Sequence, residues 1–286
     1  MTVVPKVIDI ISPLNKNAEN EAYRINEQSW DERTRIHLKS TFYDIDGFLK
    51  GKSSLNPPEL ELFGELKGKK VLHLQCHFAQ DSLSMVRMGA EVTGVDLSSE
   101  AIQAGKDLAE KAGLDIRLVA SNVYELEQHI DETFDLVFCS YGSITWLPDL
   151  KRWGKIVERF LRPGGRFVMV EFHPLCWMYD DDFTGITYSY FNEGPMLFKD
   201  LGSYTDGGDD VELEYVSWNH PLSEVMEALL EQQLELRMFK EYDYTPYNVF
   251  PALKETRPGE YRFEELGSKW PFLYGVEFVK NKAVTP

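Results

Sequence analysis

Imidazole and amide side chains alternate along one short segment, where His73, Gln75 and His77 are separated by single residues. Imidazoles bind metals and transfer protons near neutral pH, and an amide both donates and accepts hydrogen bonds. A metal would need a third ligand. The segment itself offers none, and only His173 could lie at the same edge of a sheet. We therefore expect no metal site and assign these side chains to ligand contacts or to structural hydrogen bonds.

His173 is the candidate for proton transfer, in the segment Glu171-Phe172-His173-Pro174. An imidazole at the end of a strand could take a proton from an attacking hydroxyl or amine, and Glu171 could orient the ring. The other interpretation is a hydrogen-bonded histidine that fixes the turn before Pro174. The sequence leaves both open, and His173 is also a candidate for contact with a substrate.

Asp96 ends an apolar run and is followed by Leu97 and Ser98. In open α/β sheets the ligand lies at the carboxyl ends of the strands. An acid there can accept both hydrogen bonds from a ribose diol. The alternative is a helix cap in front of the helix that begins near Ser98.

Charge limits the classes of partner. The chain has 286 residues, with 47 acidic and 30 basic side chains, and its net charge is −17. This balance disfavours nucleic acids and anionic membranes, which attract Lys and Arg, and favours a small-molecule ligand. Three cysteines form no CxxC pair, residues 1–11 do not resemble a signal peptide, and no apolar run is long enough to span a membrane. We expect a cytoplasmic protein. The sequence does not predict its oligomeric state.

The elements that position these residues alternate between strand and helix. Apolar runs predict parallel strands covered on both faces, and the alternation predicts a doubly wound α/β sheet. The expected strands are residues 71–75, 91–96, 116–120, 134–140, 166–172, 234–242 and 272–280. The expected helices are residues 18–39, 81–88, 98–113, 149–161 and 221–233, and Pro163-Gly164-Gly165 is expected to form a tight turn.

Two regions stand outside this pattern. Residues 1–60 form an N-terminal helical segment that could act as a lid, and residues 61–286 form the main domain. Residues 174–219 are aromatic and irregular and are expected to be an insertion after the fifth strand. Tyr179 in this insertion could close over a substrate, or serve an interface or a packed cap. The long connection after residue 242 is a second insertion or a functional loop.

Four segments resemble the class I S-adenosylmethionine-dependent methyltransferases in order and spacing over about residues 68–172. They are Val71-Leu72-His73-Leu74-Gln75-Cys76-His77-Phe78-Ala79, Gly94-Val95-Asp96-Leu97-Ser98, Phe134-Asp135-Leu136-Val137 and Leu161-Arg162-Pro163-Gly164-Gly165. The resemblance implies a Rossmann-like sheet of seven strands, mostly parallel, whose last strand is antiparallel. It also implies S-adenosyl-L-methionine as cofactor. The His-Leu-Gln-Cys-His-Phe segment is similar to that of a bacterial subgroup of these methyltransferases.

The first loop departs from the family pattern acid-x-Gly-x-Gly-x-Gly. The four positions hold His73, Gln75, His77 and Ala79, so the glycines that let the backbone approach the cofactor are absent. The cofactor could still bind, with Gln75 and His77 side chains replacing water or backbone contacts. The chain could instead bind it weakly or not at all, or hold another nucleotide.

The resemblance also assigns residues at the other strand ends. Asn122 stands where the family often has an acid that bonds adenine, and Val123 would flank the ring. The alternative for Asn122 is a turn residue. Ser140 and Tyr141 end the fourth strand, where the family contacts the methionine part and admits the acceptor. Trp146 could face the sulfonium or pack under the next helix.

The N-terminal helical segment carries further candidates for the cofactor. In the family such a segment often covers the cofactor, and Trp30, Arg33 and Tyr43 would face it. Arg33 could form a forked ion pair with the cofactor carboxylate. The alternative is a solvated helix face with one buried tryptophan.

The sequence thus predicts a methyltransferase that acts on a small molecule by in-line methyl transfer. A non-catalytic S-adenosylmethionine-binding or regulatory protein with a degenerate loop is the alternative. A nicotinamide-dependent oxidoreductase would need GxGxxG after the first strand, which residues 75–80 do not supply.

Overall fold

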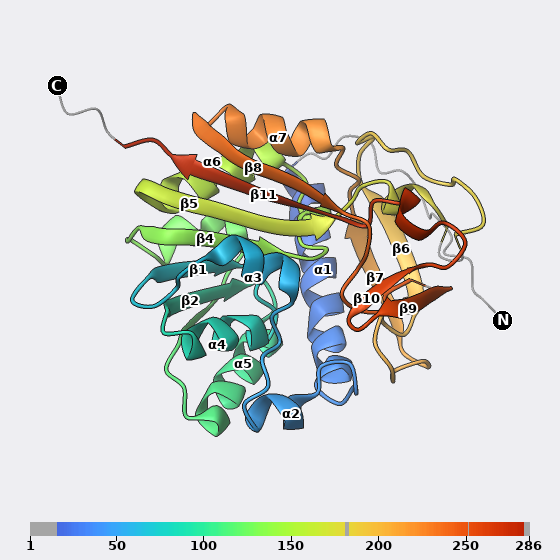
Figure 1. Cartoon of the computed structure of the whole chain (residues 1–286), viewed down its shortest axis with the longest axis horizontal. Coiled ribbons are helices and arrows are strands. Elements are labelled where there is room, and N and C mark those ends of the chain that lie inside the picture. The colour runs from blue at the N-terminus through green and yellow to red at the C-terminus, as the bar shows by residue number, and fades with distance from the viewer. Residues whose placement is uncertain (1–15, 181–182, 251, 283–286) are drawn as a thin grey trace.

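A seven-stranded sheet forms the centre of the computed structural model, which describes residues 16–180, 183–250 and 252–282 (Figure 1). Residues 1–11, which are not expected to form a signal peptide, lie outside these ranges. The strand order is β3-β2-β1-β4-β5-β11-β8. Only β11 runs antiparallel to its neighbours β5 and β8, so the predicted doubly wound, mostly parallel sheet is confirmed. The strands are β1 Lys70–Leu74, β2 Glu91–Asp96, β3 Arg117–Ala120, β4 Phe134–Ser140, β5 Leu161–Phe172, β8 Leu234–Tyr242 and β11 Leu273–Lys280.

Helices cover both faces of the sheet, because its central strands β1, β4 and β5 are buried on both sides. One face packs against α3 (Pro57–Phe63), α4 (Gln80–Arg87) and α5 (Ser99–Ala112). The other packs against α6 (Leu150–Phe160) and α7 (Leu222–Leu230). Short 3-10 turns lie at Val123–Gln128, Ile144–Trp146, Cys176–Met178 and Gly267–Lys269. Within the described ranges, no helix combines the length and apolar character needed to cross a membrane.

Two local predictions differ from the structure. Asp81 was expected to begin a helix as its cap, but α4 begins at Gln80 and Ala79 is its N-cap. The tight turn expected at residues 163–165 is part of β5, which starts at Leu161. The pairing with β4 shifts register between Phe134 and Leu136, so the segment that contains Gly164, with φ of 78°, is an irregular part of this strand. Ser98 does cap α5, with its Oγ accepting from the Ala101 N–H at 2.9 Å.

The N-terminal segment and both insertions gather beside the carboxyl ends of the strands (Figure 1). The segment contains α1 (Lys16–His37) and α2 (Ile45–Leu49). The insertion after β5 was expected to be irregular, but it contains a hairpin of β6 (Met196–Leu201) and β7 (Glu212–Ser217). The connection after β8 contains a second hairpin, β9 (Leu253–Arg257) and β10 (Glu260–Phe263). Asn26 of α1 bonds the Val216 backbone in both directions, at 2.9 and 2.8 Å. This pair joins the N-terminal helix to the β6–β7 hairpin.

Gly154 lets α6 and α7 approach closely. A Cβ atom at this position would lie 2.2 Å from the Ala228 carbonyl oxygen, which is backbone and cannot turn aside. Alanine is otherwise the better helix former by about 0.5–1 kcal/mol. We predict that Gly154→Ala lowers the free energy of unfolding by about 1–3 kcal/mol, as overpacked positions do. Chemical denaturation measures this change in the free energy of unfolding. The exposed Lys155→Ala on the same helix is the control. A Gly154→Ala protein that is more stable than the unaltered chain would contradict the close contact of α6 and α7 at this residue.

Candidate functional site

A cavity of about 1230 Å³ opens at the carboxyl ends of the parallel strands. This exceeds the roughly 300–1,000 Å³ of a pocket for one drug-sized ligand, so there is room for a second ligand. All the site residues predicted from the sequence line it except His173. They are Trp30, Arg33, Tyr43, His73, Gln75, His77, Asp96, Leu97, Asn122, Val123, Ser140, Tyr141, Trp146 and Tyr179. Their roles toward a ligand stay predictions.

The glycine-free loop after β1 keeps a backbone shape that normally requires glycine. Gln75, His77 and Ala79 have φ of 55°, 51° and 61°. A non-glycine residue in this left-handed region is strained by roughly 1–2 kcal/mol. These are the three positions at which the family pattern has glycine. In this chain the left-handed backbone therefore occurs at these positions without glycine.

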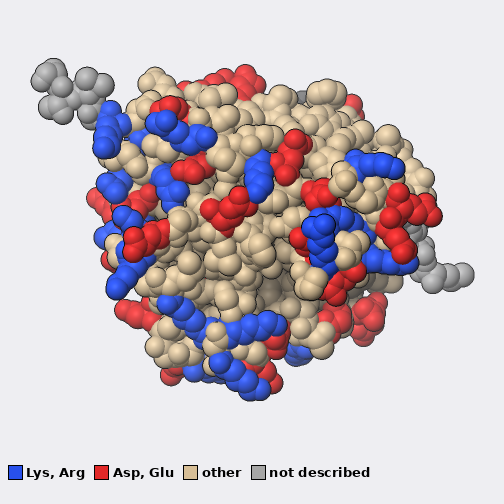
Figure 2. Space-filling view, viewed as in Figure 1, with Lys and Arg blue, Asp and Glu red and all other residues tan. Residues whose placement is uncertain are grey.

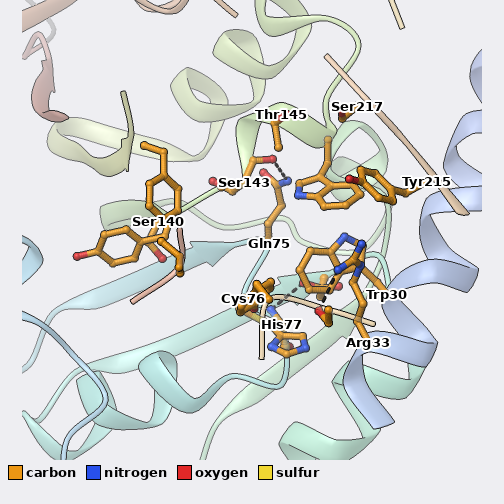
Figure 3. Close-up of a pocket in the computed structure, with 18 of the residues that line it drawn as sticks. Trp30, Arg33, Gln75, Cys76, His77, Ser140, Ser143, Thr145, Tyr215 and Ser217 are labelled. Carbon is orange, nitrogen blue, oxygen red and sulfur yellow. Dashed lines mark hydrogen bonds between the residues drawn. The ribbon is translucent and has the colours of Figure 1, made fainter. Parts of the chain in front are cut away.

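Hydrogen bonds hold this strained loop in place. The backbone N–H of His77 donates to Asp96 Oδ2 at 2.7 Å, and that of Cys76 donates to the Val95 carbonyl at 2.9 Å. Gln75 Nε2 donates to the Ser143 carbonyl at 2.6 Å and so bridges the ends of β1 and β4 (Figure 3). Strain of this kind persists where surrounding contacts over-determine the backbone, and it clusters at functional sites.

His73, which replaces the family's acid, has one ring nitrogen without a partner. The side chain is 2% exposed. Its Nδ1 lies 2.8 Å from Ser82 Oγ, whereas Nε2 has no hydrogen-bond partner among the described residues. Burial lowers the pKa of His73 to about 3, so the ring is neutral at physiological pH. His73 lines the cavity, but its Nε2 atom is itself buried, so this nitrogen is not exposed to a ligand in this conformation.

Asp96 binds two backbone N–H groups and retains free lone pairs. Its Oδ1 accepts from the Ser98 N–H at 2.9 Å and its Oδ2 from the His77 N–H. A carboxylate offers about four acceptor positions, so Asp96 can accept a further hydrogen bond beyond those from the backbone. Burial raises the pKa of Asp96 to about 6. The side chain serves the following helix and remains suited to a diol, so the two interpretations of the sequence are compatible.

Asn122 and Val123 lie at the end of β3. Asn122 Oδ1 accepts from the Tyr124 N–H at 3.0 Å and caps the 3-10 turn. Its amide NH₂ makes no hydrogen bond to the described residues and can donate to a ring nitrogen. Val123 and Leu97 supply apolar surface on the same cavity wall.

Arg33 is a buried cation without a carboxylate partner among the described residues. It is 6% exposed, and its Nη1 donates to Ser203 Oγ at 2.9 Å. The guanidinium carbon lies 5.8, 5.8 and 5.0 Å from the ring centres of Trp30, Trp146 and Tyr215. Burial lowers its pKa from the usual value, but an arginine stays charged. Figure 3 shows Arg33 and Trp30 reaching from α1 toward the loop at His77.

Aromatic rings enclose the His77 imidazole. The ring centres of Trp30, His37 and Tyr43 lie 5.3, 5.0 and 5.5 Å from that of His77. Burial lowers the pKa of His77 to about 3, and the charge of Arg33 adds to this. The His77 side chain is therefore neutral and poorly suited to take a proton at neutral pH.

Trp146 and Tyr179 stand at different parts of the cavity. The Trp146 ring centre lies 5.1 Å from that of Trp30 and so joins the group around Arg33. Tyr179 stacks on Phe183 at 5.6 Å and touches Trp270 edge-on at 5.1 Å. It thus belongs to the aromatic packing of the insertions.

His173 is not brought to the cavity. Its Nδ1 accepts from the Leu175 N–H at 3.2 Å, and its Nε2 lies 3.2 Å from Glu241 Oε1 on β8. Both nitrogens are engaged by the protein, as in the turn-fixing interpretation. The expected orienting role of Glu171 is wrong, because its carboxylate instead accepts from the N–H groups of residues 142, 143, 144 and 172. This buried carboxylate fixes the turn after β4.

The sequence did not indicate two carboxylates that lie at or near the cavity. Asp81 lines the cavity, and Glu59 of α3 accepts a hydrogen bond from the Tyr141 hydroxyl. Neither forms an ion pair within the described residues. Burial, with the charge of Asp81 added, raises the pKa of Glu59 to about 7, although hydrogen bonds from Tyr141 and Asn56 lower it. No spacing in the sequence links residue 59 to residue 141. Among the described residues, no three His, Cys, Asp or Glu side chains are grouped to hold a metal ion.

The buried state of Glu59 predicts a pH-dependent stability. The folded protein keeps a proton on Glu59 that the unfolded chain loses between about pH 4.5 and 7. Folding stability therefore falls as pH rises through this window, and Glu59→Gln removes this loss. We expect the melting temperature of Glu59→Gln, relative to the unaltered protein, to rise between pH 5 and pH 8. The exposed Glu61→Gln on the same helix is the control. A constant difference would contradict the assignment.

Comparisons with known proteins define the class of fold. Residues 72–169 match the family model described as a methyltransferase domain. A methyltransferase from Methanosarcina mazei is 22% identical, with a TM-score of 0.55 over 80% of this chain and 99% of that chain. A methyltransferase from Mesorhizobium loti is 20% identical, with a TM-score of 0.54 over 81% of this chain and 99% of that chain. Both are described as S-adenosylmethionine-dependent. The chain therefore has the fold of these methyltransferases, and its residues 72–169 are similar to the methyltransferase domain model.

Curated relatives share part of the chain. Ubiquinone biosynthesis O-methyltransferase from Klebsiella pneumoniae is 32% identical over 133 residues, which is 45% of this chain and 54% of that protein. The enzyme of that name from Escherichia coli O127:H6 is 30% identical over 158 residues, 54% of this chain and 62% of the other. The chain spans about half to two thirds of the length of these relatives.

Proposed function

We propose that this chain is an S-adenosylmethionine-dependent methyltransferase that acts on a small-molecule acceptor. The observation that carries the proposal is the left-handed backbone of residues 75, 77 and 79, the positions at which the family pattern has glycine. The loop borders a cavity large enough for a cofactor and an acceptor. The methyltransferase domain match over residues 72–169 supports the same activity.

The residues of the cavity fit this cofactor. Asp96 would accept from the ribose hydroxyls, and Asn122 would donate to the adenine ring beside Leu97 and Val123. At the other end, the buried charge of Arg33 would meet the carboxylate of the methionine part. His73, Gln75 and Ser140 would contact that part from the strand ends, and Tyr43 with His77 would cover it.

The cofactor supplies a methyl group on a positively charged sulfur, and the protein supplies position and exclusion of water. Trp30 and Trp146 present ring faces, which attract a cation. Residues 16–60 would act as the lid, since α1 brings Trp30 and Arg33 to the cavity. The acceptor would enter past Ser140 and Tyr141, with Trp146 and Tyr179 as candidate contacts. His173 is not part of the proposal, because it does not line the cavity.

Surface charge supports a small acceptor over a nucleic acid or a membrane. In Figure 2, Lys and Arg lie interspersed with Asp and Glu over the visible face, and no broad basic surface appears there. With a net charge of −17, the chain is poorly suited to long polyanions. A cytoplasmic location fits a small-molecule methyltransferase and is part of the proposal.

Calorimetry with S-adenosylhomocysteine tests the cofactor role of Asp96. Asp96→Asn should weaken binding at least tenfold, because one oxygen that would accept from the ribose becomes a donor. The melting temperature without ligand is measured alongside, since Asp96 also holds the His77 and Ser98 N–H groups. No binding of S-adenosylmethionine or S-adenosylhomocysteine by the unaltered chain at millimolar concentration would refute the proposed function. Binding without any methyl transfer would favour the non-catalytic alternative.

The role of Arg33 has a separate test with two ligands. Arg33→Met keeps an apolar chain among the rings and removes the charge. The substitution should weaken the binding of S-adenosylhomocysteine at least tenfold. The affinity for methylthioadenosine, which lacks the amino-acid part, should change by no more than about twofold. A tenfold loss is about 1.4 kcal/mol, in the range of a hydrogen bond to a charged group. An equal loss for both ligands would show that Arg33 only supports the fold.

A further inference from the structure

Tyr141 connects the cavity to a buried carboxylate. It follows β4 directly and has a left-handed φ of 32°. The turn after it is held by Glu171, whose Oε2 accepts from the Ser143 N–H at 2.9 Å. The Tyr141 ring lines the cavity, and its hydroxyl donates to Glu59 Oε2. A strained residue fixed in this way is a feature of functional sites.

Glu59 is prepared on its other side by its own helix. Its Oε1 accepts from the Asn56 N–H at 2.7 Å, which is one half of the capping box of α3, and also from Asn56 Nδ2 at 3.1 Å. Its Oε2 has the Tyr141 hydroxyl as its hydrogen-bond partner within the described chain. Glu59 is 0% exposed and forms no ion pair with a described residue. No described cation therefore holds it in the ionised state.

The part of the cavity beside Tyr141 is aromatic. The ring centre of Tyr247 lies 5.5 Å from that of Tyr141, and the rings of Trp177 and Phe250 lie 5.5 and 5.6 Å from Phe172. Edge-to-face rings of this kind favour a planar aromatic ligand. These residues come from the two insertions and from the end of β5, outside the wall that would hold the cofactor.

We propose that the acceptor is a hydroxylated aromatic compound and that Tyr141 and Glu59 together take its proton. This inference rests on the proposed methyltransferase function. The acceptor hydroxyl would donate to the Tyr141 oxygen while the Tyr141 proton passes to Glu59 Oε2. The acceptor oxygen bonds to the methyl carbon, the sulfur–methyl bond breaks, and its electron pair stays on sulfur. Tyr141 is then a catalytic residue, and Glu59 is a positioning residue that stores the proton.

The other titratable groups at the cavity are less suited to this step. Burial lowers the pKa of His73 and of His77 to about 3, whereas that of Glu59 is raised to about 7. A base works best when its pKa is near the working pH. Asp81 and Asp96 also line the cavity, and burial raises the pKa of each to about 6. Asp96 would be occupied by the ribose, so Asp81 is the competitor that matters here. It follows the cofactor loop directly, so the test includes it.

The test uses the full chain, S-adenosylmethionine and three probe acceptors: catechol, 4-nitrocatechol and 4-hydroxybenzoate. Binding of S-adenosylhomocysteine is measured first. No binding overturns the proposed function and the inference with it. Binding without methylation of any probe overturns only the inference.

With a methylated probe, Glu59→Gln should lower kcat about 100-fold with little change in KM, as loss of a general base does. The rise of kcat/KM through about pH 7 should disappear in this variant. Tyr141→Phe should likewise lower kcat with little change in KM. The exposed Glu61→Gln variant should have the same kcat and KM as the unaltered protein. Melting temperatures identify any variant that fails to fold.

Three results would contradict the proposed roles of Tyr141 and Glu59. One is a Glu59→Gln protein that folds and keeps the pH dependence of the unaltered chain. Another is loss of that pH dependence in Asp81→Asn but not in Glu59→Gln. For Glu59→Gln, a rise in KM at unchanged kcat would assign Glu59 a purely structural role and would also count against the proposal.

Discussion

The Asp96 carboxylate joins the parts of the molecule on which the site depends. It accepts from the His77 N–H at 2.7 Å and from the Ser98 N–H at 2.9 Å, so the end of β2 holds both the loop after β1 and the start of α5. Ser98 Oγ in turn donates to Asp31 of α1 at 2.6 Å. One buried acid therefore connects the loop after β1, a core helix and the N-terminal segment. A carboxylate has about four acceptor positions, so the same acid can accept a further hydrogen bond.

A second buried acid, Glu171, performs the equivalent task at β4. It fixes the turn at residues 142–144, and Ser143 of this turn accepts from Gln75 of the first loop. The ends of β1, β4 and β5 are thus tied together by side chains that span the cavity edge. This tie explains how three residues with left-handed φ are kept without glycine. In the usual pattern glycine makes this shape inexpensive, whereas here hydrogen bonds from neighbouring strands offset the strain.

The core was predictable because its signals are local. Apolar runs ended by polar residues predicted β2 and β4 with the bounds found, and Ser98 marked the start of α5. The carboxyl ends of parallel strands meet at one edge, so side chains such as Asp96 and Asn122 could be placed at one site from sequence alone. The positive φ of residues 75, 77 and 79 also matches the family's glycine positions. The sequence could not tell which contacts keep that shape without glycine.

The failures came from contacts between distant segments. His173 directly follows β5, but its N–H donates to the Phe272 carbonyl at 2.8 Å and its ring faces Glu241, which only the pairing with the C-terminal strands decides. Glu59 looked like an ordinary helix residue because its partner Tyr141 lies 82 positions later. The β6–β7 hairpin was not predicted, although Glu212–Ser217 alternates between charged and apolar residues, because the irregular aromatic residues around the two short strands obscure this signal.

The most direct test is a crystal structure of the full chain with S-adenosylhomocysteine. The account predicts that Gln75, His77 and Ala79 keep positive φ and that the ribose hydroxyls lie within hydrogen-bond distance of Asp96. It also predicts the ligand carboxylate beside Arg33. A ligand bound elsewhere, or a loop that abandons the left-handed conformation to admit it, would contradict the claim that this glycine-free loop is a preformed cofactor site.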